Sequence, residues 1–294
     1  MRLFKDALAR RATGLVAALP GLLVLLIVVG LFLKSKAILS VEPLSRLLFS
    51  AAWHPLKGEF GLLAFIAGTV WVTVTALVLA VPVSILAAIY LSEYAPRWVR
   101  EGAKPVIDLL AGLPSVVYGV WGVLLVVPFV EDVLAPLAGV HSSGYSILAG
   151  GIVLAVMTFP TIIHVTLEVF STVPRALRDA SLSLGATKWE TTRRVVLRKG
   201  AQGILAASVL GFSRAFGETM AVLMVVGNVP AVPRSLFDPG YPLPALIANN
   251  YGEMMSVPRY DAALMAAALV LMVIVLFFNV LARRILVRVE RRVR

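Results

Sequence analysis

Residues 62–92, with the sequence LLAFIAGTVWVTVTALVLAVPVSILAAIYLS, contain no charged side chain. The run is longer than the roughly 20 apolar residues with which a helix crosses the hydrocarbon core of a bilayer. Pro82 lies inside the run and is predicted to bend the helix, which packed neighbours make tolerable in a membrane. The stretch therefore predicts a transmembrane helix.

Five further apolar runs of comparable length occur along the chain, whose 294 residues are 60% hydrophobic and 15% charged. Soluble domains are only about 45–50% apolar, and a soluble helical core does not need uncharged runs of this length. We therefore expect an all-α polytopic membrane protein with six transmembrane helices. The five further spans are predicted at residues 14–33, 107–130, 145–167, 202–227 and 262–282.

The order of spans predicts three segments. Residues 1–60 are expected to hold a cytoplasmic N-terminus, the first span and an external segment. Residues 61–285 are expected to form a packed five-helix core, and residues 286–294 a basic cytoplasmic tail. An external loop is expected at residues 228–260, in which the stretch PALIANNYG (244–252) is apolar enough to form a short helix.

The net charge of +11 reflects orientation in the membrane rather than a nucleic-acid partner. Twenty Lys and Arg residues lie before the first span, after the second and fourth spans, and in the tail, whereas six lie in the alternate connections. Cytoplasmic connections carry such an excess of Lys and Arg. Both termini are therefore predicted to be cytoplasmic, and no nucleic-acid binding is expected.

The predicted cytoplasmic connection at residues 168–200 is too regularly patterned to be a flexible tether. Pro174 suits the first turn of a helix, and Gly185 can take the left-handed conformation that ends one. Thr187 and Glu190 have the spacing of a capping box, which predicts a second helix. A short helix on a rigid turn suits docking to another protein, although an amphipathic helix resting on lipid headgroups gives a similar pattern.

The same connection resembles the cytoplasmic signature of ABC importer permeases, E-A-A followed by three residues and Gly. The signature positions are held by Asp179, Ala180, Ser181 and Gly185. Asp replaces the usual Glu, Ser replaces the second Ala, and Leu197 is followed by Arg198 where the family often has Pro. The resemblance implies the type I ABC importer permease fold, with the helix before Gly185 seated in a cytoplasmic ATP-binding subunit dimer.

Four further stretches together resemble permeases of phosphate-specific ABC importers. The resemblance implies inorganic phosphate as the substrate, a bacterial inner membrane as the location, and two more partners: a second permease and an external phosphate-binding protein. These stretches are residues 60–96, 112–122, 214–228 (RAFGETMAVLMVVGN) and 235–253.

Arg214 and Glu218 are the only charged residues between Gly203 and Val226. At 100° per residue, both fall within a stripe of small residues, and such stripes mark helix–helix contacts in membranes. The pair is therefore expected to face the helix bundle or a cavity near the middle of the bilayer. The stripe consists of Gly203, Ala207, Gly211 and Ala215.

The pair is predicted to lie on the substrate path rather than to serve only as a local ion pair. Intramembrane ionisable groups mark transport paths, and a guanidinium stays charged and matches phosphate oxygens. Glu218 is expected to neutralise Arg214 when the path is empty. Ser115, Tyr118 and Thr219 are further candidates for the path.

Three other polar residues in the spans carry weaker expectations. Thr158 and Thr161 could line the path or bond to neighbouring helix backbone, and His164 is expected to pack in the core. A single arginine cannot separate tetrahedral anions of similar size, so sulfate and molybdate remain open as substrates. A channel or ion-coupled transporter that needs no ATPase also remains open, but would leave the connection at 168–200 unexplained.

Several absences limit the chemistry of the chain. It contains no cysteine, which excludes disulfides and Cys-ligated metals. It contains no G-x-x-x-x-G-K-[ST] phosphate loop, so the energy of active import would come from another subunit. No spacing of His and carboxylates predicts a metal, no group predicts catalysis, and neither an enzyme activity nor a cofactor is expected.

Overall fold

The computed structural model describes residues 2–253 and 256–293. Met1, Met254, Met255 and Arg294 lie outside the described residues, and with them the extreme ends of the predicted segments 1–60 and 286–294 and part of the loop at 228–260. Within the described residues, six helices are long and apolar enough to cross a membrane, as predicted. They are Thr13–Leu39, Leu63–Tyr94, Ser115–Leu137, Ile147–Thr172, Lys188–Phe216 and Tyr260–Arg284.

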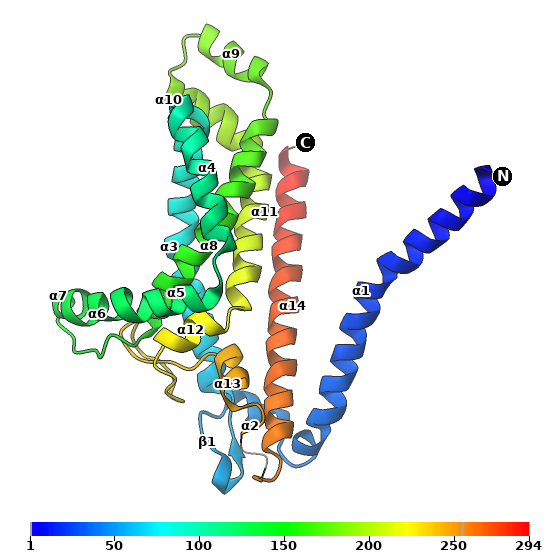
Figure 1. Ribbon diagram of the computed structural model, residues 1–294, viewed down its shortest axis with the longest axis vertical. Helices are drawn as coiled ribbons and strands as arrows, with labels where there is room; N and C mark the ends of the chain where they lie inside the picture. Colours follow the sequence, from blue (N-terminus) through cyan, green and yellow to red (C-terminus); the bar gives the residue numbers. More distant parts are fainter. Residues whose placement is uncertain (1, 254–255, 294) are drawn as a thin grey trace.

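The N-terminal part of helix α1 (Arg2–Leu39) points away from the rest of the molecule (Figure 1). It meets α14 (Tyr260–Val293) near its C-terminal end, where Ile38 is buried, while most apolar side chains from Leu15 to Leu33 are exposed. An apolar surface of this kind belongs in lipid or against another membrane helix. Helix α14 continues through the predicted basic tail, which is therefore helical as far as Val293.

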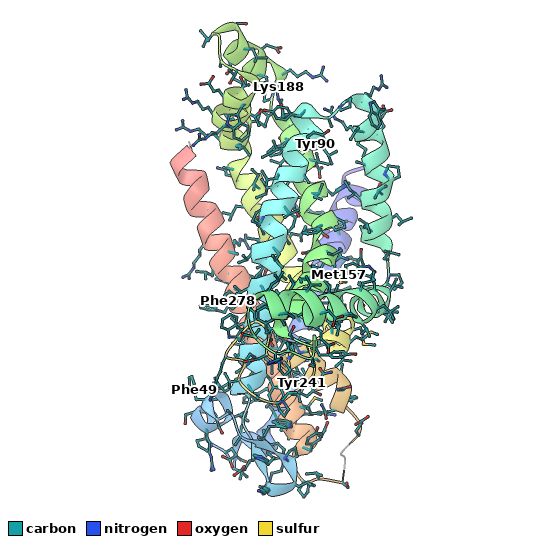
Figure 2. All side chains as sticks on the ribbon, turned by 90° about the vertical axis from the view of Figure 1, so that its left-hand side faces the viewer. Phe49, Tyr90, Met157, Lys188, Tyr241 and Phe278 are labelled. Carbon is teal, nitrogen blue, oxygen red and sulfur yellow. The ribbon has the colours of Figure 1, made fainter. Side chains whose placement is uncertain are left out.

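A small compact unit lies at one end of the molecule, where Phe49 and Tyr241 are found, and Tyr90 and Lys188 lie toward the other end (Figure 2). The unit is held by an aromatic cluster in which Trp53 stands edge-on to Phe60 and Phe65, with Tyr260 beside them. Its elements are α2 (Leu44–Phe49), the antiparallel strands β1 (Trp53–His54) and β2 (Glu59–Phe60) with the 3-10 turn η1 (Pro55–Lys57) between them, and α13 (Leu243–Asn250). Helix α13 is the short helix predicted within residues 244–252.

Helix α3 (Leu63–Ile89), extended by the π-helical turn η2 (Tyr90–Tyr94), packs along α8 (Ile147–Thr172). Pro82 lies inside α3, which continues through it. The two helices approach closely at Gly151, where an added Cβ atom would come within 2.5 Å of the Thr75 side chain. Small residues thus let backbones meet where lipid offers no hydrophobic driving force between helices.

The predicted third span was misplaced. Instead of one helix over residues 107–130, helix α4 (Arg97–Gly112) ends before Leu113, and a new helix begins at Ser115. Pro114 disfavours helical geometry at the preceding residue, and Leu113 and Pro114 are indeed extended. The new helix runs through α5 (Ser115–Trp121), η3 (Gly122–Val126), α6 (Val127–Phe129), η4 (Val130–Leu134) and α7 (Ala135–Leu137), across the others (Figure 1).

The predicted fifth span was also wrong in its bounds. A continuous helix begins at Lys188 and runs through α10 (Lys188–Thr191), η5 (Thr192–Val196) and α11 (Leu197–Phe216). It ends before residues 217–219, and a separate helix α12 (Met220–Val225) follows. Helix α11 ends near the middle of the long axis of the molecule (Figure 1).

The small-residue stripe predicted on this helix is confirmed, because it faces α8. Ala207 and Ala215 are buried, and a Cβ atom added at Gly211 would come within 2.7 Å of the Ile162 side chain. At Gly203 an added Cβ atom would overlap Val169. On the side toward α14, Phe212 and Phe216 pack against Phe278.

The packing of α11 on α8 can be tested with Gly211→Val. The added side chain overpacks the contact with Ile162, and we expect it to destabilise the fold by about 1–3 kcal/mol. The same substitution at Gly102 in α4, where an added Cβ atom meets nothing within 4 Å, is the matched control. The thermal unfolding midpoint of the purified chain in detergent should fall for the first variant only, and equal midpoints would contradict this packing.

Candidate translocation and coupling sites

Arg214 lies in the last turn of α11, half-buried, and reaches across to α8. Its Nη1 atom donates a hydrogen bond of 2.7 Å to the Thr161 hydroxyl. The partner of this guanidinium is therefore a neutral hydroxyl, which was only a weak candidate from the sequence.

Glu218 does not pair with Arg214 as predicted. The helix ends between the two residues, so the four-residue spacing that would place them on one helical face no longer applies. Glu218 instead accepts a hydrogen bond of 3.3 Å from the Ala221 amide at the start of α12. Among the described residues no ion pair joins Arg214 and Glu218, because the Glu218 carboxylate is hydrogen-bonded to the backbone of the next helix.

The Tyr118 side chain is buried, and its hydroxyl donates a 2.7 Å hydrogen bond to the Leu110 carbonyl of α4, across the break between α4 and α5. Helix α5 packs on α12, where Gly119 meets Ala221 and Met224. Tyr118 thus ties α5 to α4, and Gly119 brings α5 against α12, whereas the contact of Arg214 is with α8.

The remaining predicted path residues differ in their surroundings. Ser115 is the half-buried first residue of α5, and Thr219 is half-buried in the break between α11 and α12. Thr158 is buried and donates to the Ala155 carbonyl of its own helix, at 2.9 Å. The expectation that His164 packs in the core was wrong, because its side chain is 67% exposed. Its Nδ1 atom lies 4.0 Å from Oδ1 of Asp108.

The connection at residues 168–200 has the predicted form of helix, glycine turn, helix. Helix α9 (Arg175–Ser183) ends at Ser183 and is followed by Gly185, which has a left-handed φ of 82°. The amides of Gly185 and Ala186 donate to the carbonyls of Leu182 and Ser181, which is a Schellman motif. Pro174 precedes the helix as its cap, and Thr187 and Glu190 form the predicted capping box.

Helix α9 presents a free surface to the surroundings at the end of the molecule (Figure 1). None of its residues is buried, and the following Leu184 is 89% exposed. Of the signature residues, Asp179, Ala180 and Gly185 are exposed, whereas the Ser181 hydroxyl shares a 2.9 Å hydrogen bond with the Thr191 hydroxyl of α10. Helix α9 thus leaves most of its surface uncovered in this chain.

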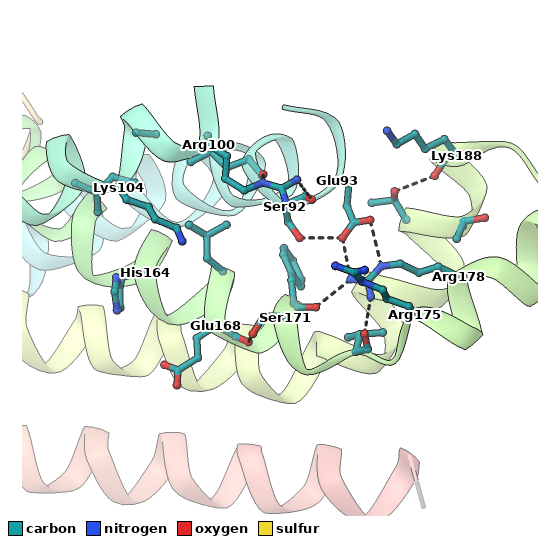
Figure 3. A pocket seen from close by; sticks show the side chains of 18 of the residues that line it. Ser92, Glu93, Arg100, Lys104, His164, Glu168, Ser171, Arg175, Arg178 and Lys188 are labelled. Atoms are coloured by element: carbon teal, nitrogen blue, oxygen red, sulfur yellow. Dashed lines mark hydrogen bonds and ion pairs between the residues drawn. The ribbon is translucent and has the colours of Figure 1, made fainter. Parts of the chain in front are cut away.

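A cavity of ≈ 780 Å³ that the sequence did not predict lies beside α9, between the ends of α3, α4 and α8. Its lining includes Lys104, His164 and Glu168 on one side and Arg175, Arg178 and Lys188 on the other (Figure 3). At its wall Arg178 pairs with Glu93 of η2 at 2.9 Å. Neither residue had a sequence signal, because their 85-residue separation gives no pattern of spacing.

Two solved structures of ABC transporters share the fold of this chain. A bacterial alginate ABC transporter has a TM-score of 0.60 at 19% identity over 97% of this chain and 99% of that chain. The MetNI methionine ABC transporter has a TM-score of 0.56 at 19% identity, over 84% of this chain and 98% of that chain.

The chain belongs to the family of binding-protein-dependent transport system inner membrane components, which matches residues 80–294. It is therefore a multi-pass inner-membrane protein. It is 36% identical, over 98% of its length and 91% of the relative's, to the phosphate transport system permease protein PstC of Mesorhizobium japonicum. It is 38% identical to the PstC protein of Xylella fastidiosa strain 9a5c, over 83% of its length and 79% of the relative's.

The glycine turn after α9 generates a test of docking. Gly185→Val forces a β-branched residue into a left-handed conformation, whereas Gly185→Asn keeps a residue that tolerates it. We expect the Val variant to lose most of its co-purification with the ATP-binding subunit and the Asn variant to keep it. Both should retain the helical circular dichroism of the wild type, and equal capture by the two variants would contradict docking through this turn.

Proposed function

We propose that the chain is a transmembrane permease subunit of an ATP-driven importer of inorganic phosphate, in which Arg214 contacts the anion. It would form the translocation path with a second, PstA-like permease. A PstB-like ATP-binding dimer would dock on α9, and a PstS-like external protein would deliver phosphate. The relatives named as phosphate transport permeases, which match 83% and 98% of the chain, support the substrate.

The observation that carries the proposal is the incomplete pairing of Arg214. A guanidinium has five N–H donors, and within the described part of the chain its side chain makes one hydrogen bond, to a neutral hydroxyl. Its positive charge is therefore left without a bonded carboxylate at the place where a helix is broken. Broken helices in transporters place ion and substrate sites near the bilayer midplane.

Glu218 has a different role in this proposal from simple neutralisation of Arg214. Its carboxylate accepts the Ala221 amide at the start of α12, and it lies four residues from Arg214 in sequence, within the break. A nearby carboxylate that is not paired with the guanidinium leaves the cation available while weakening anion binding. Conduction needs such a site, because an ion that binds too tightly cannot leave.

The orientation we propose has both termini and α9 on the cytoplasmic side of a bacterial inner membrane. The segment counts of Lys and Arg support this arrangement. The start of α1 and the end of α14 both lie toward the end of the molecule that carries α9 (Figure 1). A cytoplasmic α9 is also what docking to an ATP-binding subunit requires.

The substrate and the role of Arg214 can be tested together by uptake of radiolabelled phosphate and sulfate. Cells that lack their own copy of the permease but contain the partner subunits would receive wild-type chain or Arg214→Gln. We expect the wild type to import phosphate and the Gln variant to be slower by at least about tenfold, the factor that 1.4 kcal/mol represents.

Arg214→Lys is the matched control, since it keeps the charge but loses the planar fork, and we expect intermediate uptake. Membrane levels and assembly of each variant would be measured by co-purification. Normal phosphate uptake by an assembled Gln variant would remove Arg214 from the path. Uptake of sulfate in place of phosphate would keep the permease and overturn the substrate.

The hydroxyl that holds Arg214 provides a second prediction. Thr161→Val keeps the shape of the side chain and removes the hydrogen bond, which is worth about 0.5–1.5 kcal/mol. We expect phosphate uptake to fall by roughly two- to tenfold. Thr158→Val, one turn away on the same helix, removes a hydroxyl bonded only to its own backbone and should leave uptake near the wild-type rate.

A further inference from the structure

The docking helix α9 is tied to the end of α3 by one ion pair. Arg178 of α9 binds Glu93 of η2 through two hydrogen bonds, Nη2 to Oε1 at 2.9 Å and Nε to Oε2 at 3.3 Å. The side chains are only 18% and 11% exposed. Two parallel bonds between a guanidinium and a carboxylate define orientation as well as distance.

Arg178 also joins α9 to the end of α8. Its guanidinium donates to the backbone carbonyls of Phe170 and Val173, in the last turn of α8 and just after it. One side chain thus connects three elements, as Figure 3 shows around Glu93 and Arg178. Since no residue of α9 is buried, these polar contacts and the bond between Ser181 and Thr191 attach the helix, rather than an apolar core.

Glu93 is itself held in a fixed position. The Ser92 hydroxyl donates to its Oε1 atom at 2.9 Å. Arg100 of α4 donates to the carbonyls of Leu91 and Ser92, at 2.8 and 2.7 Å, and so fixes the backbone of η2. A force on Glu93 is therefore carried into the end of α3 rather than absorbed by a mobile side chain.

Stability alone does not account for this pair. An ion pair whose side chains are this little exposed costs desolvation, and apolar residues of similar volume often hold two elements together as well or better. What an ion pair with two defined bonds provides is a rigid, oriented connection between α9 and α3. Helix α3 in turn packs along α8 and α11 and reaches the aromatic cluster at the opposite end, at Phe65.

We propose that Glu93 and Arg178 are positioning residues that transmit movement of α9, imposed by the ATP-binding subunit, to α3. This inference rests on the proposed function, because it assumes a permease driven by an ATP-binding subunit. The pair makes the docking helix and the cytoplasmic end of α3 one rigid body. Its loss would let α9 move with the ATP-binding subunit while α3 stays behind.

The test compares Glu93→Gln with a matched control in the complete transporter, reconstituted in proteoliposomes with its external binding protein. Glu93→Gln removes the charge, keeps the size, and leaves Arg178 bonded to the end of α8. Glu101→Gln makes the same change in an exposed pair with Arg97 on α4. ATP hydrolysis, phosphate uptake and assembly of the complex would be measured for each.

We expect the Glu93→Gln complex to assemble and hydrolyse ATP but to move at least about fivefold less phosphate per ATP, the lower end of typical coupling between sites. Glu93→Asp, which retains the charge, should restore part of this ratio, and Glu101→Gln should keep it. An unchanged ratio for Glu93→Gln would overturn the proposal. A Glu93→Gln complex that falls apart would also overturn it, since the pair would then be a structural anchor only.

A second measurement does not depend on phosphate as the substrate. The chain has no cysteine, so spin labels can be placed at Arg175→Cys and Tyr90→Cys, at the start of α9 and the end of α3. We expect their distance to stay constant when ATP binds in the otherwise wild-type complex and to change in Glu93→Gln. A wild-type distance that changes with ATP would overturn the rigid link, whereas a constant distance without phosphate uptake would overturn only the proposed substrate.

Discussion

A bilayer offers no hydrogen bonds to a polypeptide, so every polar group within it must find a partner in the protein. Continuous helices satisfy this requirement for their own backbones, and most of this chain is helical. The break at residues 217–219 is the important exception. There the amides of Gly217 and Glu218 bond to carbonyls in the last turn of α11, and the Glu218 carboxylate accepts the Ala221 amide of the next helix.

The break explains why Arg214 and Glu218 do not neutralise each other. The Arg214 guanidinium donates a hydrogen bond to the Thr161 hydroxyl, and the Glu218 carboxylate accepts one from the Ala221 amide. The Arg214 contact depends on the close approach of α11 to α8, which the glycines at 203 and 211 permit. Packing of small residues thus sets the position of the Arg214 guanidinium, and the helix break directs the Glu218 carboxylate to the backbone of α12.

The candidate coupling site lies next to the start of one long helix, and the candidate translocation site lies at its end. From Lys188 to Phe216 the chain is continuously helical over 29 residues, about 43 Å at 1.5 Å per residue. The capping box beside the docking turn begins this helix, and Arg214 lies in its last turn. With the Arg178–Glu93 link to α3, the docking helix is joined to two of the helices that surround α8.

Local sequence determined the features that depend on one helix at a time. The number of spans follows from hydrophobic length, the turn at Gly185 from the conformational freedom of glycine, and the capping box from a fixed spacing of three residues. The stripe on α11 followed from helical period alone. Pro114 is a local signal for the break between α4 and α5, but only the tertiary structure decided where α11 ends and which distant side chains meet. Hydrophobicity does not place the break after α11, because apolar residues continue on both sides of residues 217–219. Nor does any spacing link Arg178 to Glu93 or Arg214 to Thr161, because packing of separate helices brings them together.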